Sequence, residues 1–448
     1  MQLPRMIEIE QKLYAKRVKD IDGAVRRAWN AAGIAAKLTR STRVAITVGS
    51  RGIDNIVAIT RALVGLAKAA GAKPFIIPAM GSHGGATPAG QTELLASLGV
   101  TPESVGAPIR ASMATAKIGE TRNGTPVYAS QEALKADGLV AVNRIKQHTD
   151  FTGDYESGLA KMLAIGVGKR ECAVAMHSGL CASLREDVPA AAAMMIERLP
   201  VLGGIAILEN GYHQTAEIVG IPAGEILRRE WHLLRRVRRS VPSFPFDEID
   251  LLIVDWIGKD VSGVGFDTHV IARRMIWGEP EFCRAGMSPH PRRQIPPGGS
   301  CSTPTGRSFR SCPTGIRVIA ALDVTPGSHG NALGVGLADL VTKRLADKID
   351  WNVVRTNVLH TGFLNRAKLP ITLPNDRELL RAAFLAMGSP DPKKARIVRV
   401  ADTLQIGRLW ISEGLLAEAR RNRRITILGK PTPFAFDKNG DLARLARL

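Results

Sequence analysis

Short β-branched runs alternate with segments of helical periodicity from residue 43 onward, and this alternation constrains the fold more than any other feature of the chain. Strands are expected over 44–48 and 73–78, and helices over 55–70 and 88–98. Strands that alternate with helices are typical of βαβ units, in which the strands lie parallel. The sequence therefore predicts an α/β fold with a mostly parallel sheet.

The same alternation continues in two blocks that meet near residue 245. Further strands are predicted over 138–145, 204–208, 249–255, 316–324, 396–400 and 425–428, and further helices over 131–136, 226–241, 332–348 and 413–421. The sequence SVPSFP at 240–245 breaks the last helix of the first block. We therefore expect two α/β domains with mostly parallel sheets, over residues 1–245 and 246–448.

The chain is strongly basic, with 61 Lys and Arg against 41 Asp and Glu and a net charge of +20. This balance makes nucleic acids and small anions the first partners to consider. Residues 226–241 predict an arginine-rich helix with Leu227, Trp231, Leu234 and Val237 on one face. Its other face is either a nucleic-acid or membrane-surface contact or a solvated surface. No nucleic-acid-binding module is recognisable and aromatic residues are only 5%, so no specific nucleic-acid partner is expected.

Residues 283–313 look foreign to the rest of the chain. The segment has no hydrophobic period and no acidic residue, and it holds three of the five cysteines. Such a loop is unusual inside a compact domain, so we expect a disordered or mis-framed insertion.

The few cysteines of the chain imply no disulfide framework. The sequence shows neither a secretory signal nor a run of about 18 apolar residues, so a cytoplasmic protein without membrane contact is expected.

Three polar side chains follow predicted strands of the first domain. Arg51 follows the first strand, His83 lies in PAMGSHGGAT after the second, and His148 follows the strand at 138–145. Because ligands bind at the carboxyl ends of parallel strands, these side chains are expected to converge. Histidine suits proton transfer because its pKa is near 6.5, and arginine captures carboxylate or phosphate groups. Glycines in the same loop would let the backbone approach an anion.

Several motifs of the chain resemble those of the lactate racemase (LarA-like) family, whose members carry a nickel-pincer nucleotide. The resemblance extends from about residue 40 to 440 and includes GSRGI (49–53), PAMGSHGGAT (78–87), NRIKQHTDF (143–151), ESGLAKML (156–163), AMHSG (175–179), GKDVSGVGFDT (258–268) and SHGNALGVGLAD (328–339). It implies a racemase or epimerase that inverts a 2-hydroxy acid by base-assisted hydride transfer to and from the cofactor. It also implies an active site in the interdomain cleft, a 2-hydroxy acid as substrate, and cofactor-assembly proteins as partners.

The resemblance implies catalytic and cofactor-binding roles for four residues. His83 and His148 resemble the two catalytic bases. Lys161 resembles the lysine that is bound covalently to the cofactor (nickel pyridinium-3,5-bisthiocarboxylic acid mononucleotide) through a thioamide. His177, sixteen residues later, resembles the nickel ligand.

The remaining matches concern the anionic ends of the substrate and the cofactor. Arg51 resembles the arginine that meets the substrate carboxylate or a nearby phosphate, and Lys259 resembles a substrate-anchoring cation from the second domain. Gly84 and Gly85 are expected to contact the cofactor. Lactate racemases have an acidic residue just before the arginine motif, whereas this strand ends in VGSR. Two alternatives stay open: a related oxidoreductase or isomerase acting on a sugar acid or polyol, and, from the net charge of +20 and the arginine-rich helix at 226–241, a basic nucleic-acid-associated protein.

Overall fold

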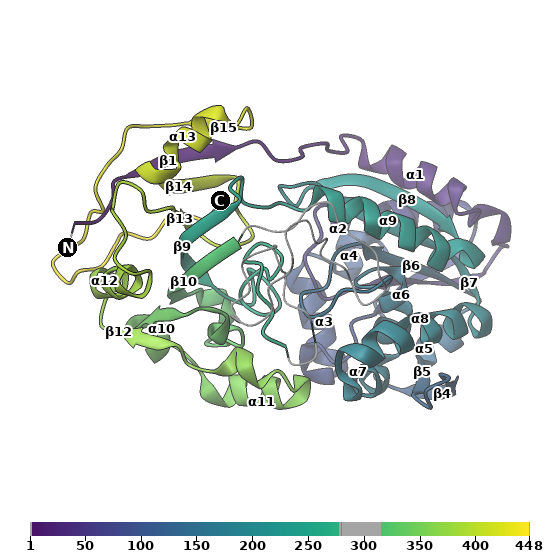
Figure 1. The fold of residues 1–448 in the computed structure, drawn as a ribbon. Helices are drawn as coiled ribbons and strands as arrows, with labels where there is room; N and C mark the ends of the chain where they lie inside the picture. The colour runs from purple at the N-terminus through teal and green to yellow at the C-terminus, as the bar shows by residue number, and fades with distance from the viewer. Residues whose placement is uncertain (1, 277–278, 280–314, 448) are drawn as a thin grey trace. The chain divides into compact units, whose positions relative to one another are not determined.

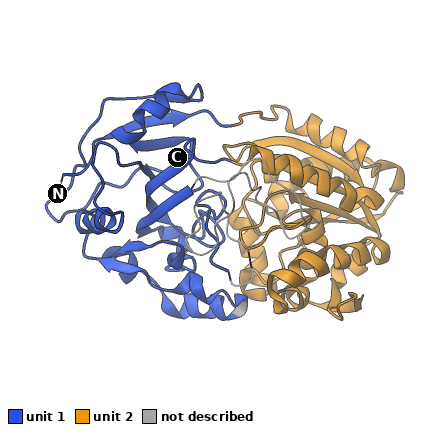
Figure 2. Cartoon of the chain, in the orientation of Figure 1, with its two compact units in different colours: residues 1–13, 242–448 blue, residues 14–241 orange. Residues whose placement is uncertain are grey.

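The computed structural model describes residues 2–276, 279 and 315–447. The expected insertion at 283–313 lies outside the described residues. The chain forms two compact units, one of residues 14–241 and one of residues 1–13 together with 242–448 (Figure 2). Among the described helices, none combines the length and the apolar character needed to cross a bilayer.

The first thirteen residues belong with the second half of the chain rather than with the domain predicted over 1–245. Strand β1 (Met6–Gln11) pairs antiparallel with β14 (Arg408–Ser412) on one side and β15 (Ile425–Ile427) on the other. No strand was predicted before residue 43, although the sequence MIEIE alternates apolar and acidic residues.

The unit of residues 14–241 is built on a five-stranded sheet in the order β3-β2-β6-β7-β8 (Figure 1). The strands are β2 (Arg43–Val48), β3 (Lys73–Pro78), β6 (Gly138–Arg144), β7 (Val201–Glu209) and β8 (Thr215–Pro222). All neighbouring pairs are parallel except β7 with β8. The predicted parallel sheet is therefore confirmed. Its strands read as continuous apolar runs because they are buried on both faces.

Helices and a small hairpin complete this unit. They are α1 (Ile21–Ala31), α2 (Ile56–Ala69), α3 (Pro88–Ser97), α4 (Pro102–Val105), α5 (Gln131–Leu134), α6 (Leu159–Lys161), α7 (Lys169–Ser178), α8 (Leu180–Arg198), α9 (Ile226–Ser240), β4 (Thr115–Glu120) and β5 (Pro126–Ser130). Helix α3 begins as its sequence predicts, because Thr87 Oγ1 accepts from Gly90 N at 3.1 Å and Pro88 takes the first helical position.

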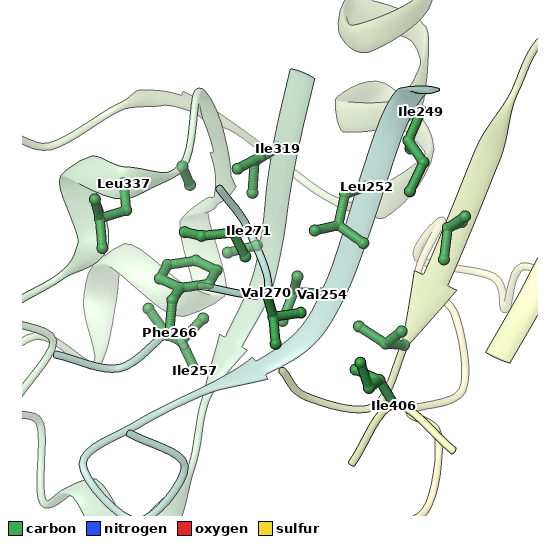
Figure 3. Close-up of a cluster of buried hydrophobic side chains, with 14 of the residues drawn as sticks. Ile249, Leu252, Val254, Ile257, Phe266, Val270, Ile271, Ile319, Leu337 and Ile406 are labelled. Atoms are coloured by element: carbon green, nitrogen blue, oxygen red, sulfur yellow. The ribbon is translucent and has the colours of Figure 1, made fainter. Parts of the chain in front are cut away.

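The other unit contains an eight-stranded sheet in the order β12-β11-β10-β9-β13-β14-β1-β15. Its further strands are β9 (Glu248–Ile257), β10 (Gly315–Val324), β11 (Leu340–Thr342), β12 (Ile371–Leu373) and β13 (Ile397–Val400), and its helices are α10 (Lys343–Asp347), α11 (Trp351–Thr361), α12 (Asp376–Ala386) and α13 (Glu413–Arg421). The strands from β12 to β13 pair in parallel. Figure 3 shows its core, where Leu252 and Val254 of β9 lie near Ile319 of β10 and Phe266. Both units are thus α/β with mostly parallel sheets, whereas an interdomain cleft stays a prediction.

One predicted helix of this unit is wrong. Residues 332–348 form a 3-10 turn (Val335–Leu337), the strand β11 and the helix α10 instead of one long helix. A Cβ atom on Gly334 would lie 1.7 Å from the carbonyl oxygen of Val264, and one on Gly336 would lie 2.3 Å from that of Asn365. Close backbone packing therefore overrides the helical periodicity of the segment.

Candidate active site

Three adjacent parallel strands bring the predicted residues to one edge of the five-stranded sheet. Arg51 follows β2, His83 follows β3 and His148 follows β6, and β2 lies between the other two. Parallel strands share their direction, so these carboxyl ends meet at the same edge, which is the usual ligand-binding edge of open α/β sheets. The expected convergence thus follows from the topology.

The His83 imidazole is exposed and is tied to the end of β2. Its Nδ1 atom makes a short hydrogen bond with the hydroxyl of Ser50, the residue before Arg51. If the Nδ1–H group donates to Ser50 Oγ, the Nε2 atom is the basic nitrogen. Sequence reasoning missed Ser50, although it stands within the GSRGI motif.

His148 is buried and contacts Lys161 directly. The His148 Nε2 atom lies 2.6 Å from Lys161 Nζ, while its Nδ1 atom accepts from the backbone N–H of Asp150 at 3.2 Å. With Nδ1 accepting, a neutral ring carries its proton on Nε2 and donates a hydrogen bond to Lys161 Nζ when that amine is neutral. Burial lowers the pKa of His148 well below its usual value, and the Lys161 charge acts in the same direction.

Lys161 ends the short helix α6 and precedes a π-helix over Met162–Val167. Burial lowers its pKa to about 8, with Arg51 lowering it further and Asp150 opposing the change. An amine with this pKa is neutral far more often at pH 7 than an ordinary lysine. It therefore suits formation of a covalent bond to a carbonyl or thiocarbonyl carbon.

His177, in the last turn of α7, has the ring form that binds a metal. Its Nδ1 atom lies 2.6 Å from the carbonyl oxygen of Ala173, which accepts but cannot donate, so Nδ1 carries the proton. Burial and Lys161 lower the pKa of His177, so the ring is neutral near pH 7 and Nε2 keeps a lone pair. A neutral amine at Lys161 and a free Nε2 at His177 are compatible with the predicted cofactor attachment and metal binding, which stay predictions. The described residues contain no group of three or more His, Cys, Asp or Glu that could hold a metal ion.

Asp150 supplies a carboxylate near His148, Lys161 and His177, and sequence reasoning did not single it out. It raises the pKa values of His148, Lys161 and His177, in each case against the larger effect of burial. Its carboxylate lies 3.7 Å from His148 Nδ1. The electrostatic coupling of these residues, and of Arg51 with Lys161, shows that four of the predicted site residues lie close together.

Helix α9 holds the segment that carries His148 and Lys161. The buried Glu230 carboxylate accepts from Ala160 N at 2.8 Å, next to Lys161, and burial raises its pKa to about 7. Arg238 pairs at 2.5 Å with the buried Glu156, whose other oxygen accepts from His148 N at 2.7 Å. Sequence reasoning missed these contacts, although Glu230 stands among the buried apolar residues of α9.

The α9 interface should contribute measurably to stability. Removing one partner of a buried ion pair typically costs about 3–5 kcal/mol, because the other charge stays buried and unpaired. We expect Arg238→Met to lower the free energy of unfolding by roughly this amount, measured by urea denaturation. The control is Arg236→Met, since the Arg236–Glu217 pair is solvated and should contribute only about 0–1 kcal/mol. Equal effects of the two variants would contradict this role of Arg238.

The other predicted contacts are less well defined. A Cβ atom on Gly84 would lie 2.6 Å from the backbone of Gly90, so packing alone requires this glycine. Gly85 has φ of 64° and open space around its Cα atom. Lys259 belongs to the other compact unit, where its Nζ atom donates to the carbonyl of Gly263 at 2.7 Å. Cofactor binding by the glycines and substrate binding by Lys259 stay predictions.

Four of the six arginines of α9 form ion pairs with acidic side chains. Arg236 pairs with Glu217 at 2.5 Å, and both Arg228 and Arg229 pair with Glu225 at 3.2 Å. The predicted apolar face was also partly wrong, because the buried face holds Ile226, Glu230, Leu233, Leu234 and Val237. These pairings disfavour a nucleic-acid contact along this helix.

Comparison with known proteins gives one family match, which covers part of the chain. The lactate racemase N-terminal domain family matches residues 4–188. No curated protein gives a significant sequence match. Two solved structures are distantly similar: a Thermotoga maritima protein (12% identity, TM-score 0.42) and the lactate racemase apoprotein from Thermoanaerobacterium thermosaccharolyticum (14% identity, TM-score 0.39). Each similarity covers 56% of this chain and 66% of the other chain, and at such TM-scores it carries no argument about activity.

Proposed function

We propose that this chain, whose residues 4–188 match the lactate racemase N-terminal domain family, is a LarA-like racemase or epimerase. In this proposal it inverts a 2-hydroxy acid by base-assisted hydride transfer to and from a nickel-pincer nucleotide. The observation that carries the proposal is the buried contact of 2.6 Å between His148 and Lys161. The residue proposed as a general base and the residue proposed to hold the cofactor are thereby adjacent. His177, with Nε2 unprotonated, supplies the imidazole that a metal would take.

Inversion of a 2-hydroxy acid requires hydrogen to leave a very weakly acidic carbon. When bound at Lys161 and His177, the nickel-pincer nucleotide supplies the acceptor and later the donor of a hydride. A histidine on one side removes the hydroxyl proton, and a histidine on the other side serves the opposite enantiomer, so two bases are needed. In the proposed assignment, His83 and His148 take these roles.

The substrate carboxylate needs a fixed cation while the 2-oxo acid intermediate rotates between the two bases. Arg51 follows β2, between the strands that lead to His83 and His148, and its guanidinium suits bidentate capture of a carboxylate. Anchoring of this kind keeps the intermediate in place and avoids the entropic cost of a second encounter. Lys259 of the other unit is the second proposed anchor.

The test uses protein produced together with the cofactor-assembly proteins, with nickel content and absorbance confirming the loading. We expect it to invert at least one member of a panel of single-enantiomer 2-hydroxy acids that includes sugar acids, as followed by chiral chromatography. Deuterium at C2 should slow the reaction, because the C–H bond breaks. If loaded protein inverts none of them, the racemase proposal fails, and assays for oxidation or isomerisation of sugar acids and polyols test the alternative.

A further inference from the structure

Lys169 is a buried lysine for which the proposed reaction has no use. Its side chain is 1% exposed, and burial lowers its pKa to about 8. Its backbone takes a left-handed φ of 56°, which is uncommon for a residue with a side chain. A lysine is rarely buried unless its ammonium group is hydrogen bonded, so the hydrogen-bond partners of this group indicate the role of Lys169.

The Lys169 ammonium group joins two segments of the candidate site. It donates to the carbonyl oxygen of Pro78, the last residue of β3, and to Gln91 Oε1 at 3.0 Å. Gln91, which is fully buried, donates through Nε2 to the carbonyls of Gly81 at 3.0 Å and His83 at 3.3 Å. Lys169 and Gln91 thus bond to three backbone carbonyls of the segment that carries His83.

The two segments also pack at backbone distance. A Cβ atom on Gly166, in the π-helix after Lys161, would lie 2.7 Å from the carbonyl oxygen of Ala79. One on Gly81 would lie 3.1 Å from Ile165 Cγ2. Neither side of this contact can accept an added methyl group without a shift, so small movements of the two segments are coupled.

We propose that Lys169 and Gln91 are positioning residues that fix the His83 loop against the segment carrying Lys161. The effect on catalysis rests on the proposed function, whereas the effect on the loop does not. Hydrogen bonds from buried side chains to loop carbonyls replace the regular secondary structure that the loop lacks. A displacement of about 1 Å of a reacting group can cost roughly 100-fold in rate, so such a device has a measurable effect.

The first experiment measures amide hydrogen exchange over 80–87 in the chain without cofactor. The amides of His83, Ala86 and Thr87 are hydrogen bonded within this loop. Lys169→Met should speed their exchange by about tenfold or more, because the Pro78 carbonyl and the Gln91 side chain, which holds the loop, each lose a hydrogen bond. The matched control is Arg170→Met, which changes the exposed neighbouring residue and should leave this exchange unchanged. Unchanged exchange in Lys169→Met would overturn the proposal.

A second variant keeps the test decisive if Lys169→Met does not fold. Gln91→Glu retains an acceptor for the Lys169 ammonium group but loses the Nε2 donor to Gly81 and His83. We expect faster exchange over 80–87 in this variant as well. Exchange at the wild-type rate in Gln91→Glu would show that the loop carbonyls do not depend on this side chain.

The second experiment separates positioning from general stability. In a single turnover, each enantiomer is oxidised with the help of only one of the two histidines. If Lys169→Met or Gln91→Glu displaces His83, the oxidation rate of one enantiomer should fall by up to about 100-fold, and that of the other should stay nearly unchanged. Equal slowing of both enantiomers would mean a merely structural role. If wild-type protein oxidises neither enantiomer of any 2-hydroxy acid, the proposed function fails, while the exchange experiment still decides whether Lys169 and Gln91 hold the loop.

Discussion

Replacing either His83 or His148 with alanine is expected to slow racemisation by about 10²–10⁴-fold, the usual effect of losing a positioned base. Inversion removes the hydroxyl proton on one side of the substrate and returns it on the other. Each histidine is therefore needed whichever enantiomer is supplied. The measurement is the initial rate of inversion from each enantiomer, followed by chiral chromatography of cofactor-loaded protein.

The two variants differ in what else they disturb. His83 is exposed and bonded to Ser50, so His83→Ala should leave folding and nickel content unchanged. His148 is buried against Lys161, so nickel content must be measured beside the rate in His148→Ala. His232, an exposed histidine on α9, provides the control, and His232→Ala should retain the wild-type rate. Wild-type inversion by either His83→Ala or His148→Ala would exclude the two-base mechanism.

The sheet of the unit of residues 14–241 could be predicted because its strands are buried on both faces. The runs VAITV and PFIIP are apolar except for Thr47, and they end before a glycine and at a proline, so their limits are visible in the sequence. Strand β1 was not predicted because it pairs only with strands some 400 residues away in the chain. The helix expected over 332–348 failed because contacts with Val264 and Asn365 override local periodicity.

The site was predictable where it follows strand ends and not where it depends on distant helices. Arg51, His83 and His148 each follow an apolar run, so topology alone indicates their common edge. Glu230 contacts Ala160 across 70 residues of sequence, and Lys169 contacts Pro78 across 91. No periodicity reports such contacts. The one indication in the sequence was Glu230, a charged residue among the buried apolar residues of α9.

Lys161→Ala is expected to abolish covalent attachment of the cofactor. With a pKa of about 8, about a tenth of the Lys161 amines are neutral at pH 7, against roughly one in 3,000 for a lysine with a pKa near 10.5. Only the neutral amine is a nucleophile, so this difference favours Lys161 by about 300-fold over an exposed lysine. Intact mass should show the cofactor on wild-type protein and none on the variant.

The pH dependence of attachment provides an independent check on the role of Lys161. Below its pKa the neutral fraction rises about tenfold per pH unit, so the attachment rate should climb toward pH 8 and then level off. A lysine with an ordinary pKa would show a rate that still rises at pH 9. The control is Lys135→Ala, which removes an exposed lysine of the same unit and should keep the wild-type loading and pH profile. Equal cofactor loading of Lys161→Ala and wild-type protein would exclude Lys161 as the attachment site, and His177 would then have to hold the cofactor without a covalent bond from this helix.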